Sequence, residues 1–340
     1  MHWSVVAPFI NDDFIANEQW LDDWVPGSKY DFTKIPRRDA FGNLNCSSST
    51  SLSEWKAFWN QSVEAKKATL GGIITAFPQL AVTTGLQQRL SSRPIPVIAW
   101  SFNVGQCYPG LKQRMSRFAL QKIDKFIVHS QQERKVLSQW LGLPQERFEF
   151  VPLNRPNISV TEEEETQKPF ILAMGSANRD YRTLFQAVEK LKIRTIVVAG
   201  EHALSDLKIP PQVEVYSRIK IDECHRLAQK ARLNIVPLHD TPVASGQITI
   251  IDAMLMKRAM ISTKCVGSED YVQHGKTGWF VQPNNVDDLT HSIEKLWSDS
   301  ALRSQLAKAA GQYAERHFSD AVAGARLSQI IDNVVEKNSV

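Results

Sequence analysis

The sequence lacks the features of secreted and membrane-spanning proteins. Its four cysteines (Cys46, Cys107, Cys224 and Cys265) are scattered, which predicts reduced thiols and neither a disulfide framework nor a zinc site. No apolar run approaches the length of a membrane span. The first residues have neither the basic start nor the apolar length of a signal peptide. We therefore expect a cytoplasmic protein.

The excess of positive over negative charge is also small, with 40 lysines and arginines against 36 aspartates and glutamates. A net charge of +4 over 340 residues is too small to indicate a nucleic-acid protein, and we expect no nucleic-acid partner. The pI of about 8.8 is compatible with anionic nucleotides or with the surface of an anionic membrane. No Asp-x-Asp metal motif is present, because the acidic pairs Asp12–Asp13 and Asp22–Asp23 are adjacent.

Apolar strand patterns alternate with helical patterns in two successive halves. The first half ends near residue 153, and the alternation restarts at Phe170 after a Pro-flanked segment with four consecutive glutamates, which indicates a linker. This alternation predicts an α/β protein with parallel sheets whose faces are covered by helices. We predict domains at 1–153 and 170–318, a linker at 154–169 and a C-terminal helix at 319–340.

The most informative stretch is 236–283. An apolar strand at 235–238 leads through a Pro- and Gly-containing loop into a helix that begins around Ser245, Gly246, Gln247, Ile248 and Thr249. Unpaired N–H groups and a partial positive charge at such a helix start suit a diphosphate. Asp252 follows six residues after Gly246, where a carboxylate could reach past the diphosphate to sugar hydroxyls.

This stretch resembles the donor-binding signature of retaining glycosyltransferases of family 4, which have the GT-B fold. The resemblance rests on Asp252-Ala253-Met254, the strand 259–263, Gly267 with Asp270, and Gly275-Lys276-Thr277-Gly278. It implies two Rossmann-like domains that face a central cleft, a first domain that binds the acceptor, and a final helix that returns to it. One departure is that Ala244 stands where the family has its first glutamate, which contacts the transferred sugar; Gln247 and backbone amides are the candidates to replace it.

A second glycine marks the expected phosphate loop. Gly175 ends the first strand of the second half, where a ligand can approach the backbone, and Ser176 to Arg179 follow. The family has an arginine and a lysine on the diphosphate here; Arg179 takes the lysine position and Ser176 the arginine position. We expect Arg179 to give a bidentate contact to a diphosphate oxygen. Arg218 lies where the family binds the nucleotide base. It could stack on the base or be exposed to solvent, and both interpretations stay open.

In the first domain the family often has a histidine near the strand that ends at Trp100. Asn103 is the nearest polar candidate here, and His129 ends the following strand, where a buried, hydrogen-bonded histidine is the simpler interpretation. Basic and apolar residues interleave over 110–126. We prefer a helix that covers the sheet with its apolar residues; contact with an anionic membrane or acceptor is the alternative.

These patterns predict an enzyme that moves a sugar from a nucleotide-diphosphate sugar to a sugar, lipid or small-molecule acceptor. The resemblance implies retention of anomeric configuration, no required cofactor or metal, and catalysis by Arg179, Asn103 and Gln247. Two alternatives stay open: a degenerate GT-B protein that binds a sugar nucleotide or a partner without turnover, and a GT-B sugar-nucleotide epimerase. Peripheral contact with the inner face of a membrane is a further open alternative.

Overall fold

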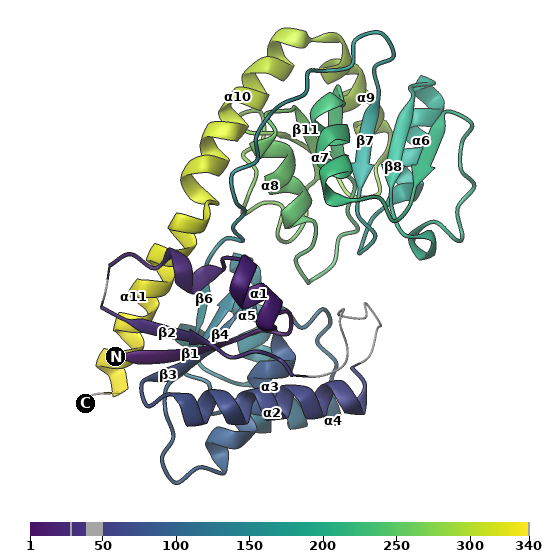
Figure 1. The fold of residues 1–340 in the computed structure, drawn as a ribbon. Coiled ribbons are helices and arrows are strands. Elements are labelled where there is room, and N and C mark those ends of the chain that lie inside the picture. The colour runs from purple at the N-terminus through teal and green to yellow at the C-terminus, as the bar shows by residue number, and fades with distance from the viewer. Residues whose placement is uncertain (28, 39–49, 339–340) are drawn as a thin grey trace. The chain divides into compact units, whose positions relative to one another are not determined.

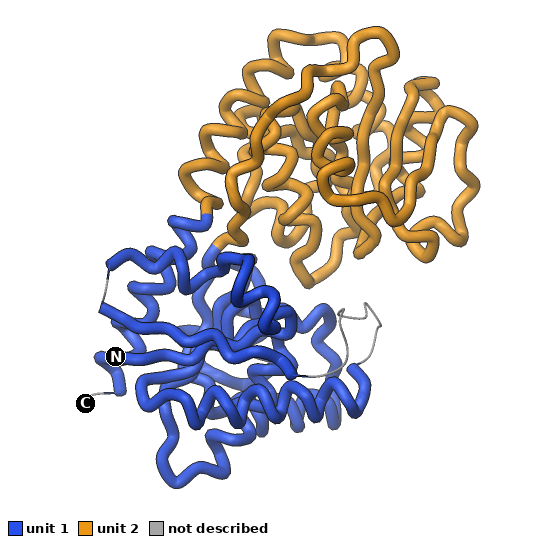
Figure 2. The backbone as a smooth tube through the Cα atoms, viewed as in Figure 1, with its two compact units in different colours: residues 1–151, 320–340 blue, residues 152–319 orange. Residues whose placement is uncertain are grey.

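The computed structural model describes residues 1–27, 29–38 and 50–338, so Cys46 and the serines at 47–49 lie outside the described residues. The chain divides into two compact units (Figure 2). Unit 1 comprises Met1–Val151 and Asp320–Val340, and unit 2 comprises Pro152–Ser319. Each unit contains a six-stranded parallel sheet (Figure 1), which confirms the predicted class of α/β fold.

The sheet of unit 1 has the order β2-β1-β3-β4-β5-β6. Its central strands are buried on both faces, as expected of a parallel sheet covered by helices. The strands are β1 (His2–Val6), β2 (Asp31–Lys34), β3 (Gly72–Ala76), β4 (Val97–Trp100), β5 (Lys125–Val128) and β6 (Phe148–Phe150).

Helices cover both faces of this sheet. One face packs against α2 (Leu52–Ala68), α3 (Pro78–Arg89), α4 (Leu111–Leu120) and α5 (Gln131–Leu141). The other face packs against the C-terminal helix α11 (Asp320–Asn338), whose buried residues include Leu327 and Ile331. The short helix α1 (Asp12–Asn17) follows β1. Residues from both ends of the chain therefore share one core.

The sheet of unit 2 has the order β12-β11-β10-β7-β8-β9. Its strands are β7 (Ile171–Met174), β8 (Thr195–Val198), β9 (Val213–Tyr216), β10 (Leu233–Val236), β11 (Met260–Thr263) and β12 (Trp279–Val281). Helices α6 (Tyr181–Leu191) and α9 (Val286–Ser298) cover one face. Helices α8 (Gln247–Leu255) and α10 (Ser300–His317) cover part of the other, and α7 (Ile221–Lys230) completes it.

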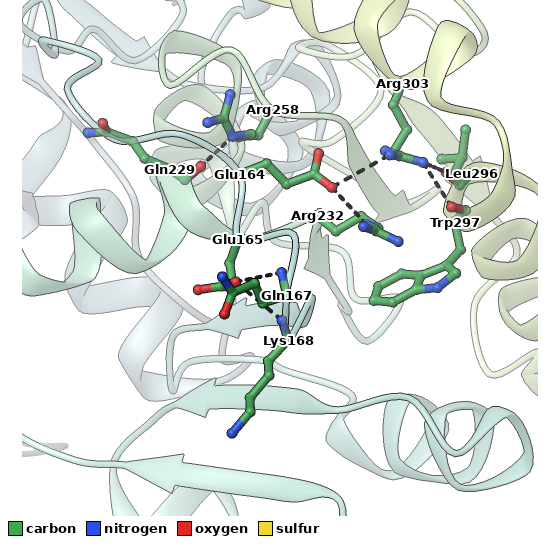
Figure 3. A network of polar contacts seen from close by, with 10 residues as sticks. All are labelled: Glu164, Glu165, Gln167, Lys168, Gln229, Arg232, Arg258, Leu296, Trp297 and Arg303. Atoms are coloured by element: carbon green, nitrogen blue, oxygen red, sulfur yellow. Dashed lines mark hydrogen bonds and ion pairs between the residues drawn. The ribbon is translucent and has the colours of Figure 1, made fainter.

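The segment 154–169, which the sequence predicts as a linker, packs on unit 2. Glu164 accepts from Nε of Arg232 at 2.7 Å and lies 3.6 Å from Nη2 of Arg303 (Figure 3). Upstream, the amides of Thr161 and Glu162 donate to the Gln229 side chain at 2.7 and 2.9 Å. Glu164, one of the four glutamates that suggested a solvated linker, is therefore a partner of Arg232, which directly precedes β10, and of Arg303 in α10.

Helix α4 differs from the expected arrangement. Only Ala119 and Leu120 are buried, whereas Leu111, Met115 and Phe118 are 71%, 63% and 56% exposed. The preferred prediction, a helix that covers the sheet with its apolar residues, is therefore wrong for these three, whereas Leu120, Ile123 and Phe126 of the same stretch are buried as predicted. Among the described residues, no helix is long and apolar enough to cross a membrane.

Candidate functional site

The candidate site of unit 2 lies at the carboxyl ends of its strands. The chain adds β8 and β9 on one side of β7 and β10 to β12 on the other side, so the strand order reverses between β7 and β10. In open α/β sheets, ligands usually bind outside the carboxyl ends of the strands at such a point. The loop 175–180 after β7 and the loop 237–246 after β10 flank this point.

Gly175 and Arg179 form one structural feature in the loop after β7. Gly175 has φ +109°, and a Cβ there would lie 2.4 Å from Nη2 of Arg179. Only glycine therefore allows the guanidinium to fold back over the end of the strand. Arg179 donates from Nε to the carbonyl of Met174 at 2.9 Å, from Nη1 to that of Ala177 at 2.8 Å, and from Nη2 to Oγ1 of Thr249 at 3.0 Å.

These bonds fix the guanidinium without exhausting it. Arginine has five N–H donors, so two, one on Nη1 and one on Nη2, remain for a ligand after these three bonds. Burial lowers the pKa of Arg179 from its ordinary value, although arginine stays protonated in proteins. The side chain is thus a partly desolvated cation held at the switch point of the sheet.

Asn178 joins the loop after β7 to the loop after β10. Its backbone has φ +57°, a conformation that asparagine tolerates better than most residues. Its Nδ2 atom donates to Oγ1 of Thr241 at 3.0 Å and to Oγ of Ser245 at 2.9 Å. Ser245, a candidate from the sequence, therefore holds the loop that leads into α8. Sequence analysis missed Asn178, because its partners lie more than sixty residues away.

Helix α8 begins where the sequence predicts. Gly246 is its N-cap with φ +81°, and a Cβ there would lie 2.8 Å from Cδ2 of Leu238. The amides of the first turn, which include those of Ile248 and Thr249, lack carbonyl partners within the helix. Ile248 is 49% exposed, so this turn is open to solvent. Thr249 anchors Arg179, which brings this cation beside the helix start.

Ala244 and Gln247 are both buried, at 3% and 5% exposure. Ala244 packs against Gly267, where an added Cβ would lie 2.6 Å from Cβ of Ala244 and 3.1 Å from Nε2 of Gln247. Gln247 therefore lies against the glycine turn after β11. Its suggested role in place of the first glutamate stays a prediction.

Asp252 is held by an arginine that the sequence did not suggest. Its carboxylate accepts from Nε of Arg155 at 2.7 Å and from Nη2 at 3.3 Å, and the aspartate is 5% exposed. Nε2 of His225 lies 3.9 Å from Oδ2. Arg155 also bridges to the end of unit 2, because its amide donates to the carbonyl of Phe318 at 2.8 Å. In the structure, Asp252 thus contacts the segment 152–158.

Ser176 follows β7 and Arg218 follows β9, the two strands that pair with β8. Oγ of Ser176 accepts from the amide of Gly200 at 2.8 Å and thereby ties the loop after β7 to the loop after β8. His202, which sequence analysis did not consider, lies beside this contact, since a Cβ at Gly200 would be 2.8 Å from its ring. Arg218 follows β9, is exposed and has φ +57°. Its role at the base stays a prediction.

In unit 1, Asn103 and His129 follow adjacent strands. Asn103 is exposed, and its Oδ1 accepts from the amide of Gly105 at 2.8 Å in a turn. Nδ1 of His129 lies 2.7 Å from the carbonyl oxygen of Val151, and its Nε2 lies 3.0 Å from Oγ of Ser101. A carbonyl only accepts, so Nδ1 carries the proton. His129 is 5% exposed, which together with these two contacts confirms the buried, hydrogen-bonded interpretation, and burial lowers its pKa to about 4.

Three comparisons place this geometry among known proteins. Residues 168–299 match the family described as Glycosyl transferases group 1. The α-D-kanosaminyltransferase of Streptomyces kanamyceticus is 28% identical over 83 residues, which are 24% of this chain and 22% of that protein. Among the described residues, no cluster of three or more His, Cys, Asp or Glu side chains could hold a metal ion.

The fold is shared over nearly the whole chain. The sucrose-phosphate synthase of Thermosynechococcus elongatus superposes with a TM-score of 0.72 at 15% identity and 99% coverage of both chains. Anabaena HepE in complex with UDP-glucose superposes with a TM-score of 0.69 at 13% identity, over 98% of this chain and 99% of that one. The chain thus has the GT-B fold, and the match to the family described as Glycosyl transferases group 1 lies within its second unit.

Proposed function

We propose that the protein is a glycosyltransferase that moves a sugar from a nucleotide-diphosphate sugar to an acceptor with retention of anomeric configuration. The observation that carries this proposal is the pairing of Arg179 with the start of α8, through Nη2 and Oγ1 of Thr249 at 3.0 Å. A cation and a helix N-terminus together suit a diphosphate. The match of residues 168–299 to Glycosyl transferases group 1 supports the same reaction class.

The reaction breaks the anomeric C–O bond, and negative charge grows on the leaving diphosphate. The two N–H groups of Arg179 that remain after its three internal bonds would donate to this charge. The first amides of α8 would donate from the other side. Because both groups are fixed before the substrate binds, they stabilise charge with little reorganisation, which is the basis of electrostatic catalysis. In this proposal they serve in place of a metal ion.

We propose a UDP-sugar as the donor, because the structure of HepE, which shares the fold, contains UDP-glucose. Asp252 is proposed to reach the nucleotide sugar only if its contact with Arg155 rearranges, since the carboxylate is engaged in the structure. Thermal-shift measurements with UDP-, GDP- and ADP-sugars would rank the donors.

The decisive experiment measures release of the nucleoside diphosphate from the best donor, with and without acceptors, and determines the anomeric configuration of the earliest product by NMR. Slow release without an acceptor, abolished in Arg179→Ala, would support a competent transferase centre. Product of inverted configuration would refute retention. An epimerised nucleotide sugar would instead identify the epimerase reaction.

The second candidate is a degenerate GT-B protein that binds a sugar nucleotide without turnover. Two observations favour it: Ala244 stands buried in place of an acid, and Asp252 is paired with Arg155. Binding of a UDP-sugar with no release of UDP under any acceptor would establish this candidate. Measurable release, lost in the Arg179 variant, would exclude it.

A further inference from the structure

Helix α4 exposes an apolar stripe on unit 1. Leu111, Met115 and Phe118 recur at helical spacing and are 71%, 63% and 56% exposed. Nearby Tyr108 is 44% exposed. A contiguous apolar surface of this kind usually marks an interaction site, whereas single exposed apolar side chains are common on any protein surface.

The stripe forms one wall of a groove of about 990 Å³. The facing wall comes from α3, with Val82 and Leu86, and two tryptophans, Trp55 and Trp140, complete the mostly apolar lining. This volume lies at the upper end of the range for small-molecule sites, about 300–1,000 Å³. The groove is therefore large enough for an organic ligand and offers it mainly apolar contacts.

The groove has a direction. Helix α3 follows β3 and helix α4 leads into β5, so both helices start at the carboxyl edge of the parallel sheet. At 1.5 Å per residue, the stripe from Leu111 to Phe118 extends about 10 Å away from that edge. Asn103, which follows β4 and is the nearest polar candidate for the place where the resembling family often has a histidine near the transferred sugar, also lines the groove. A ligand along the groove would thus have one end near the expected reaction centre of unit 1.

Cations mark the same end. Lys112 and Arg114 line the groove in the first turns of α4, and no described residue that lines it is acidic. Nζ of Lys112 lies 4.2 Å from the ring centroid of Tyr108, which holds the ammonium over the apolar surface. The polar end of the groove is therefore complementary to an anion.

We propose that this groove binds the acceptor and that the acceptor is a lipid with an anionic headgroup. The headgroup meets Lys112 and Arg114, and the apolar chain lies between α3 and α4. This inference rests on the proposed transferase function. In the transfer, the anomeric carbon forms a bond to a headgroup hydroxyl oxygen, its bond to the diphosphate oxygen breaks, and the hydroxyl proton passes to the departing diphosphate.

The test uses dodecyl phosphate below its micelle concentration as the probe, titrated into the full chain by calorimetry. We expect one molecule to bind per chain, at least tenfold more tightly than dodecyl maltoside or inorganic phosphate, because each of these lacks one half of the recognition. Combining Met115→Glu with Phe118→Glu should weaken binding at least tenfold. Both side chains are more than half exposed, so the fold should tolerate the change.

Matched controls separate the groove from general surface effects. Leu70→Glu places the same charge at a residue of unit 1 that is 92% exposed and does not line the groove, and it should leave binding unchanged. Combining Lys112→Gln with Arg114→Gln should reduce the affinity for dodecyl phosphate to that for dodecyl maltoside. Lys67→Gln, an exposed lysine on α2, is the control for lost charge.

Three results would overturn the inference. The first is binding only to phosphatidylglycerol vesicles and not to the monomeric probe, which would make the stripe a membrane contact. The second is a dimer in ultracentrifugation that Phe118→Glu dissociates, which would make it an interface between copies. The third is UDP release from a UDP-sugar without any binding of dodecyl phosphate. Binding of the probe without UDP binding or release would instead refute the proposed transferase and leave a lipid site.

Discussion

The ion pair between Asp252 and Arg155 gives the sharpest prediction for unit 2. The sequence suggests that Asp252 contacts only the donor, in which case its loss would leave the fold intact. The structure shows a forked contact with Nε at 2.7 Å and Nη2 at 3.3 Å, with side-chain exposures of 7% for Asp252 and 24% for Arg155. Removal of either partner therefore strands a largely buried charge.

The magnitude follows from burial. Breaking a fully buried ion pair costs about 3–5 kcal/mol, and losing a hydrogen bond to a charged group costs about 1.5–3 kcal/mol. Because Arg155 keeps 24% of its side-chain exposure, water compensates part of the loss. We expect Asp252→Asn and Arg155→Met each to lower the free energy of unfolding of unit 2 by about 2 kcal/mol. The double variant should lose about 1 kcal/mol less than the sum of the two.

The assay is urea-dependent hydrogen exchange of peptides from residues 152–319, which reports unit 2 separately from unit 1. Additive losses within about 0.5 kcal/mol would show that the pair does not couple and would refute the reasoning. Calorimetry with UDP then tests the donor role. Weaker binding in Asp252→Asn but not in Arg155→Met would show that the aspartate also contacts the nucleotide.

Four further predictions test the site and the core. Gly175→Ala should displace Arg179, because Nη2 of Arg179 would lie 2.4 Å from the new Cβ. Calorimetry should then show UDP binding weakened about tenfold or more, which corresponds to about 1.4 kcal/mol. Gly275→Ala is the control for backbone strain, since Gly275 has φ +71° and lies in open space. Arg179→Lys should lower kcat more than it changes KM, because the fork helps most as charge develops, whereas the exposed Arg182→Lys should match the parent in steady-state kinetics. Initial rates of UDP release should survive EDTA, since Arg179 and α8 meet the leaving charge; complete loss that Mg²⁺ or Mn²⁺ restores would contradict this. The pKa of His129 is about 4 in the folded protein against an ordinary value of 6.5, so unit 1 should lose up to about 3 kcal/mol of stability as pH falls from 6.5 to 4. Hydrogen exchange should show a smaller loss in His129→Gln than in the parent protein. A loss equal to that of the parent would exclude this histidine as the cause.

Elements with strong local signals could be predicted from the sequence. Helix α5 ends at Leu141 because Gly142 adopts the left-handed conformation with φ +60°, and a glycine after a helical pattern signals such an end in the sequence. Strand β9 (213–216) and helix α7 (221–230) likewise coincide with a strand pattern and a helical pattern in the sequence. Each has an apolar pattern of a single period, bounded by residues that stop it.

Two edge strands could not be predicted. Strand β2 (Asp31–Lys34) has only four residues, two of them charged. It forms because β1 offers an open edge, with Trp3 opposite Phe32. Strand β12 (Trp279–Val281) has only three residues and pairs with β11. In both cases the partner strand, and not the local sequence, determines the structure.

The same distinction separates the parts of the candidate site. Gly175 and Gly246 can be recognised in the sequence, because Gly175 directly follows a strand pattern and Gly246 directly precedes a helical pattern. The contacts of Asn178 with Ser245 and of Arg155 with Asp252 span 67 and 97 residues and follow only from the fold. A sequence motif could indicate which loops meet a ligand, but not which side chains already have a partner.

The departures from the family pattern are balanced in charge. The resemblance leads us to expect an acid at 244 and a cation at 176, and this chain has Ala244 and Ser176. One negative and one positive group are thus absent together, so these two departures cancel in charge. Neutral contacts occupy both places: Ala244 packs against Gly267, and Ser176 accepts from the amide of Gly200 at 2.8 Å. Because neutral hydrogen bonds and packing are little screened by salt, the loops around Arg179 should keep their arrangement over a wide range of ionic strength.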